Sequence, residues 1–163
     1  MTEQQRKLAF AQSVGRYQPL SWEQIPDLGL YMDQVITFME RQCGELYGPQ
    51  EHVLTRSMVN NYVKMGLVQR PVDKKYGRES LSHLLMICTL KQALSAEGMK
   101  RLMTPAPGQT PEMLYEHFRA LQAQSLQTLS QELPLPSAMT CAVRCATYRF
   151  LCNYATAEST DET

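Results

Sequence analysis

The chain has 163 residues, of which 44% are hydrophobic and 20% are charged, and this composition is typical of a globular protein rather than a disordered one. Sixteen basic residues balance sixteen acidic residues, which excludes a uniformly basic nucleic-acid coat and a polyanionic surface. No apolar run approaches the ~20 residues that a membrane helix needs, and the first residues contain no apolar signal-peptide core. We therefore expect a cytoplasmic protein without a membrane partner.

The charges are distributed unevenly along the chain. Residues 52–101 carry nine basic and three acidic residues, a net charge of +6, whereas residues 1–51 and residues 102–163 each carry a net charge of −3. A basic segment between acidic flanks can attract an anionic partner. Composition alone favours the alternative, in which the lysine-rich segment is simply a solvated surface.

The cysteines and histidines show no catalytic or metal-binding pattern. The five cysteines include no C-x-x-C pair, so neither a disulfide framework nor a zinc site is indicated. Cys141, Cys145 and Cys152 fall on one face of a helix, where a buried core stripe is favoured over a thiolate site. The chain also has no nucleophile, zinc-protease or phosphate-binding motif. We therefore expect no enzyme activity, no metal and no cofactor.

The first part of the chain is predicted to be helical. Residues 3–17 can form a helix, and Ser21 is a plausible N-cap for a short helical turn. Apolar residues then recur with the 3.6-residue period of an amphipathic helix over residues 30–47. Gly48 and Pro49 end this helix.

A short polar helix is predicted over residues 55–65. Thr55 is the N-cap candidate, and Gly66 stands where a left-handed C-cap is expected. Its apolar residues fall on one side, and its polar residues fall largely outside that stripe: Arg56, Ser57, Asn60, Asn61 and Lys64. Asparagines are poor helix formers, so Asn60 and Asn61 indicate either a tolerated surface or a recognition surface.

A basic β-hairpin or extended wing is predicted over residues 70–78, because Pro71, Asp73 and Gly77 interrupt regular structure. The next helix, from Glu79 to Leu94, is apolar over a wide arc and is expected to be largely buried. A short helix follows Ser95, and a proline-rich linker follows that helix.

Two helices are predicted at the end of the chain, over residues 111–133 and 137–156. Thr110 as N-cap and Pro111 at the first helical position mark the start of the first. Their short connection predicts an antiparallel hairpin. One stripe of the last helix carries Met139, Val143, Ala146, Phe150 and Tyr154. Apolar residues also lie on nearly every other face, so we expect them to pack on the N-terminal helices or on a second chain in a homodimer: Met139, Cys141, Val143, Cys145, Tyr148, Phe150, Leu151 and Cys152.

The central segment resembles two known families. Residues 55–103 are similar to the winged helix-turn-helix of MerR-type transcription regulators, on these residues: Tyr62, Gly66, Leu67, Pro71, Tyr76, Arg78, Leu81 and Leu84. A closer resemblance, over residues 24–103, is to an uncharacterised bacterial family, domain of unknown function 1836, common in Gram-positive bacteria. Its blocks here are DLGLYMDQVITFME, LTRSMVNNYVKMGLV and KKYGRESLSHLLMICTLKQALSA. This resemblance implies a folded unit and no catalytic residue.

We therefore predict a mainly α fold, with a winged helix-turn-helix domain with a small β wing over residues 1–104 and a helical hairpin for dimerisation or sensing over residues 105–163. The predicted function is a transcriptional regulator that reads duplex DNA with helix 55–65 and the basic wing 70–78. The alternative is a non-catalytic protein-interaction scaffold with the same fold. The predicted DNA-binding residues are Thr55, Arg56, Ser57, Asn60, Asn61, Lys64, Arg70, Lys74, Lys75, Tyr76 and Arg78.

Overall fold

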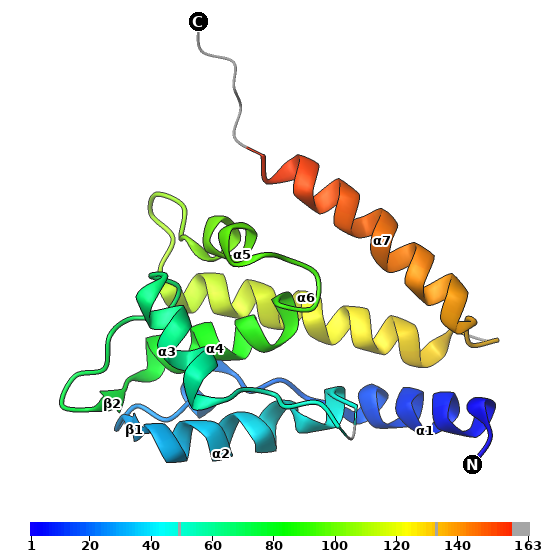
Figure 1. Ribbon diagram of the computed structural model, residues 1–163, viewed down its shortest axis with the longest axis horizontal. Coiled ribbons are helices and arrows are strands. Elements are labelled where there is room, and N and C mark those ends of the chain that lie inside the picture. The colour runs from blue at the N-terminus through cyan, green and yellow to red at the C-terminus, as the bar shows by residue number, and fades with distance from the viewer. Residues whose placement is uncertain (49, 133, 158–163) are drawn as a thin grey trace, which may run out of the picture.

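The structure is a computed structural model that describes residues 1–48, 50–132 and 134–157. These residues form a mainly α fold, as predicted, and one small antiparallel sheet (Figure 1). In chain order the elements are α1 (Glu3–Arg16), η1 (Trp22–Gln24), β1 (Leu30–Tyr31), α2 (Met32–Cys43), η2 (Gly44–Leu46), α3 (Arg56–Lys64), β2 (Lys75–Tyr76), α4 (Arg78–Leu90), α5 (Ala96–Met103), α6 (Pro111–Gln131) and α7 (Ala138–Ala155).

Side-chain caps set the start of several helices where the sequence predicted them. The hydroxyls of Thr55, Ser95 and Thr110 each accept a hydrogen bond of 3.2 Å from the backbone N–H three residues later. Each hydroxyl thereby satisfies a donor that has no partner within the helix. Pro111 occupies the first position of α6, as predicted.

The helix predicted over residues 30–47 is shorter at both ends. Leu30 and Tyr31 form β1, which pairs antiparallel with β2 in the register Leu30 to Tyr76 and Tyr31 to Lys75. The helix α2 therefore begins at Met32, and it passes into the 3₁₀ turn η2 after Cys43. A two-residue strand is too short to show the alternation of a β-strand. The apolar period of the predicted helix therefore included Leu30 and Tyr31.

The hydrophobic core lies around α4, as its wide apolar arc predicted. Leu81, Leu84 and Ile87 are completely buried, and α2, α3, α5 and the first turns of α6 supply the surrounding side chains. Tyr115 of α6 belongs to this core, and its hydroxyl donates a 2.7 Å hydrogen bond to the backbone oxygen of Leu20. The start of α6 therefore shares one core with the preceding helices.

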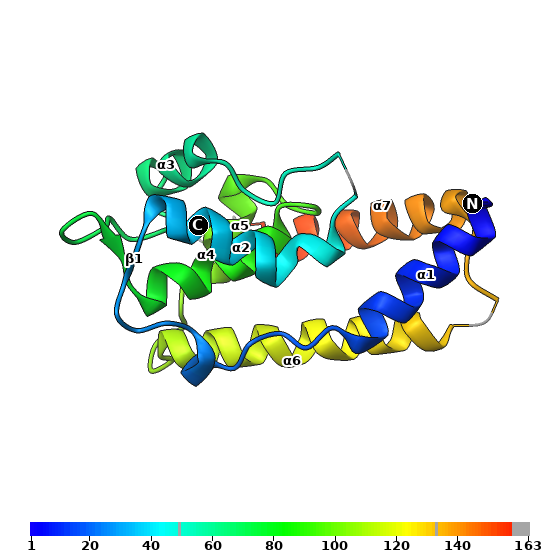
Figure 2. The ribbon, with the colours of Figure 1, turned by 90° about the horizontal axis from the view of Figure 1, so that it is seen from below.

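The second half of α6 packs against α1 (Figure 2). Ala11 and Val14 form the buried face of α1. The two helices approach closely at Gly15, where an added Cβ would lie 2.9 Å from the Cβ of Ser130. Glycine at this position lets the two backbones come together without a clash.

The helix α7 runs back in roughly the opposite direction to α6 but diverges from it (Figures 1 and 2). Every residue of α7 except Cys152 is exposed, so the N-terminal helices do not cover its apolar residues, and of the two predicted covers the second chain stays a prediction. The predicted core positions of Cys141 and Cys145 are wrong, because both side chains are exposed.

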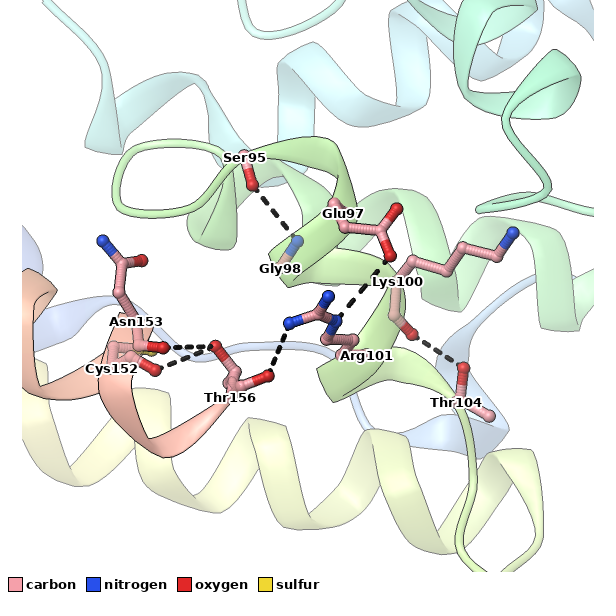
Figure 3. A network of polar contacts seen from close by, with 9 residues as sticks. All are labelled: Ser95, Glu97, Gly98, Lys100, Arg101, Thr104, Cys152, Asn153 and Thr156. Atoms are coloured by element: carbon pink, nitrogen blue, oxygen red, sulfur yellow. Dashed lines mark hydrogen bonds and ion pairs between the residues drawn. The ribbon is translucent and has the colours of Figure 1, made fainter. Parts of the chain in front are cut away.

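The physical reason is that α7 is attached to the rest of the molecule near its two ends. Arg144 forms a 2.7 Å ion pair with Glu132. At the other end, the backbone oxygen of Thr156 accepts a 2.7 Å hydrogen bond from Arg101 of α5 (Figure 3). Within the described part of the chain, no helix combines the length and apolar character needed to cross a membrane.

Candidate nucleic-acid interface

The short helix α3 presents one apolar and one polar face. Val59 and Tyr62 point into the core, and the polar side chains on the other side are all exposed: Ser57, Asn60, Asn61 and Lys64. These four positions have the i, i+3, i+4, i+7 spacing that places them together on one helix face. They line a shallow hollow on the surface. The structure therefore brings these four predicted site residues together.

Two further predicted residues lie at the start of α3. Thr55 is its N-cap and is only half-exposed. Arg56 is exposed but forms an ion pair with Asp33 in the first turn of α2. This pair joins α3 to α2 and neutralises part of the positive charge at this end of α3.

The predicted wing is a tight hairpin turn. The backbone N–H of Val72 donates to the oxygen of Lys75 (3.0 Å), and the N–H of Lys75 donates to the oxygen of Val72 (2.9 Å). The two residues between them, Asp73 and Lys74, have positive φ angles of 51° and 64°. A two-residue loop with both residues at positive φ matches the right-handed twist of the flanking strands.

The hairpin displays several basic side chains. Arg70, Lys74 and Lys75 are all exposed, and the ammonium of Lys75 lies 5.2 Å from the centre of the Tyr31 ring on β1. The pairing of β1 with β2 therefore fixes this hairpin to the segment that precedes α2.

Two predicted contact residues point inward instead. Tyr76 is only 4% exposed, because its register on β2 directs the ring into the core. Arg78 donates a 2.9 Å hydrogen bond from Nε to the backbone oxygen of Ile25. Its guanidinium also lies 3.7 Å from the carboxylate of Asp27. These contacts give Tyr76 and Arg78 structural roles, so neither side chain belongs to the candidate interface.

Lys100 of α5 is a surface cation that the sequence did not associate with α3. Gly66 follows α3 with a φ of +74°, and a Cβ added there would lie 3.6 Å from the Nζ of Lys100. Figure 3 shows the Lys100 side chain extending away from Thr156 and the end of α7. Lys100 thus adds a positive charge beside the C-terminal end of α3. The sequence predicted the glycine that ends α3, but nothing in the sequence indicated that Lys100 lies next to it.

The candidate interface consists of the polar face of α3 and the exposed cations at the same end of the molecule. Six of its side chains are basic: Arg56, Lys64, Arg70, Lys74, Lys75 and Lys100. The carboxylates of Asp33 and Asp73 lie among them and offset part of this charge. Both α3 and the hairpin lie at the end of the molecule opposite the N-terminus of α1 (Figures 1 and 2).

The loop after α3 is held to α4 by His83. The Nδ1 of His83 lies 3.1 Å from the backbone oxygen of Leu67, while its buried Nε2 has no hydrogen-bond partner in the described structure. Burial lowers the pKa of His83 below its ordinary value, so the neutral imidazole is favoured as a donor to Leu67.

Metal-ligating side chains do not cluster in the part of the chain that the structure describes, and two of the cysteines, Cys43 and Cys88, are buried. The described residues contain no group of three or more histidine, cysteine or acidic side chains placed to hold a metal ion. The hydrogen bond with Cys43 and burial together raise the pKa of the Cys88 thiol. The same contact lowers the pKa of the Cys43 thiol, and both thiols are buried in the core.

Comparison with known proteins places the candidate interface inside a family segment. No curated protein and no solved structure matches the chain. Residues 20–118 match the family described as domain of unknown function (DUF1836), in agreement with the resemblance noted from the sequence. This match runs from before η1 into α6 and includes the whole candidate interface. Because it spans more than half of the chain, the protein belongs to this family of unknown function.

Proposed function

We propose that the protein is a transcription regulator that binds duplex DNA through a winged helix-turn-helix. The order of elements supports this proposal: β1, α2, α3, a tight hairpin, β2 and then the buried helix α4. In such a module the second helix enters the major groove while the wing contacts the flanking backbone. Here α3 is the recognition helix and residues 70–75 are the wing.

The exposed face of α3 has the chemistry to read bases. The side-chain amide of asparagine can donate to N7 and accept from N6 of adenine in a bidentate pair. Asn60 and Asn61 are exposed at neighbouring positions, with Ser57 one turn before them and Lys64 one turn after. In this proposal Asn60 and Asn61 contact base edges, and Lys64 contacts a phosphate.

The observation that carries the proposal is the exposed basic hairpin at the same end of the molecule as α3 (Figures 1 and 2). Lys74 is the second residue of the two-residue turn, and Lys75 follows it. Both side chains are exposed to solvent. Phosphate neutralisation supplies most of the affinity of non-specific DNA binding. The wing therefore provides affinity and orientation, while α3 provides sequence preference.

The first test measures the salt dependence of binding to a random pool of duplexes by fluorescence anisotropy. Each phosphate contact contributes roughly −0.9 to the slope of log Kobs against log salt concentration. The double variant Lys74→Glu/Lys75→Glu should therefore bind more weakly and lose about two units of slope. Asn60→Ala should leave the slope unchanged and relax base preference by about 1–3 kcal/mol per lost bidentate pair.

A matched control separates a local interface from the overall charge. Arg6→Glu/Lys7→Glu changes two adjacent basic residues to acidic ones in α1, at the end of the molecule opposite the hairpin (Figure 1). It should bind DNA like the wild-type protein. Equal losses from both double variants would contradict the proposed interface. An absence of salt-sensitive affinity in the wild-type protein would refute DNA binding and favour a protein-interaction scaffold.

A further inference from the structure

The outward face of α7 carries an apolar stripe that nothing in the described structure covers. Met139, Val143 and Phe150 are 74%, 57% and 72% exposed, and together with Ala146 they follow one another at intervals of four, three and four residues. Alternating intervals of three and four are the signature of a helix that packs lengthwise against another helix.

The stripe points away from the body of its own chain. Three residues of α7 that face the body are Arg144, which pairs with Glu132, Cys152, which packs against the core, and Cys141, which lines a cavity with α1 and the end of α6. At 3.6 residues per turn these three lie on the side of α7 opposite the stripe. The attachments at both ends of α7 keep the helix in this orientation.

We propose that a second copy of the chain covers this stripe, so that two α7 helices pack antiparallel around a two-fold axis. In this register Met139 of one copy faces Phe150 of the other, and Val143 faces Ala146. The large ring of Phe150 then packs against the flexible side chain of Met139. The small Ala146 lets the two helices approach each other closely near the two-fold axis. The pairing is self-complementary, as a two-fold interface requires.

The charges of α7 are compatible with this pairing. The helix contains no acidic residue, and its two basic residues are Arg144 and Arg149. Arg144 lies off the stripe and is already paired with Glu132. In the antiparallel register Arg149 lies opposite Thr140 of the second copy, so no like charges meet across the interface.

The available area suits a reversible dimer. An aromatic side chain buries about 150–250 Å² when it is covered, and the paired stretch offers Phe150, which is 72% exposed. With Met139 and Val143 this residue supplies less than half of the ~800 Å² per partner found in standard interfaces. We therefore expect a dimer that forms and dissociates with protein concentration.

Sedimentation equilibrium of the full chain tests this inference. Between about 5 and about 500 µM the wild-type mass should rise from 18.6 kDa towards twice that value. Phe150→Glu places a charge in the stripe and should raise the dimer dissociation constant at least about tenfold. Val143→Lys should do the same from a second position. Circular dichroism should show native helix content, because both side chains are exposed.

Tyr148→Glu is the matched control. Tyr148 is 71% exposed, almost the same as Phe150, but it lies two residues away on the opposite face of α7. This variant should dimerise like the wild-type protein. The proposal would be overturned if the wild-type protein stays monomeric at every concentration, or if the Phe150→Glu variant dimerises normally. It would also be overturned if Tyr148→Glu and Phe150→Glu weaken dimerisation equally. The result does not depend on whether the protein binds DNA.

Discussion

Replacing Lys74 by glycine should stabilise the protein. Lys74 adopts a φ of 64° in the hairpin turn, a left-handed conformation that costs an L-residue with a side chain roughly 1–2 kcal/mol. Glycine adopts this conformation without that cost. Asp73 precedes it with a φ of 51°, but aspartate tolerates the left-handed region better than lysine does. The strain therefore lies mainly at Lys74.

The expected gain follows from two opposing effects. Glycine removes the cost of roughly 1–2 kcal/mol, but its greater freedom in the unfolded chain costs roughly 0.5–1 kcal/mol. The Lys74 side chain is exposed, so its removal leaves no cavity. The two effects leave a net gain of about 0–1.5 kcal/mol, so Lys74→Gly should raise the free energy of unfolding by about 0.75 kcal/mol, which corresponds to an increase in Tm of about 1.5–3 °C for a chain of this size.

Thermal unfolding followed by circular dichroism measures this effect. Lys75→Gly should lower Tm, because Lys75 lies in β2 with extended backbone and its ammonium contacts the Tyr31 ring. Lys74→Ala keeps the left-handed strain but removes the charge, so its Tm should stay near the wild-type value. A decrease in Tm for Lys74→Gly, or equal increases for the glycine and alanine variants, would refute the assignment of strain to this turn.

Three further outcomes are expected. Burial lowers the pKa of His83 below 6.5, so the unfolded chain binds the proton first and the urea midpoint should fall as pH drops below about 6.5. His83→Gln should flatten that dependence. Ellman's reagent should modify the exposed thiols of Cys141 and Cys145 rapidly in the native protein, and the two buried cysteines only after unfolding. Arg78→Ala removes the hydrogen bond to Ile25 and should lower the free energy of unfolding by about 1–3 kcal/mol in urea titrations.

Features that depend on neighbouring residues in the sequence were predictable. The caps at Thr55, Ser95 and Thr110 rely on a hydroxyl and an N–H three residues apart, so the starts of three helices followed from local chemistry. The left-handed Gly66 was predicted for the same reason. The polar face of α3 followed from helical spacing alone, which is why most of the candidate interface was found.

Features that depend on distant partners were not predictable. The inward direction of Tyr76 is set by its register against Leu30 in β1, far away in the chain. Lys100 joins the candidate interface only because α5 packs beside Gly66. The stripe on α7 was visible in the sequence, but periodicity shows only that an apolar face exists. Which surface covers that face is a property of the tertiary or quaternary structure.

The length of α6 determines which fragments of this protein keep their buried side chains covered. The family segment ends at residue 118, but α6 continues without a break to Gln131. A fragment cut at residue 118 that keeps α1 would lose the surface that covers Val14, which is 1% exposed in the intact chain. Such a fragment should be prone to aggregation, since it exposes core side chains. Fragments that retain α1 therefore need to extend through residue 131, and fragments that stop at 118 need to begin after Arg16.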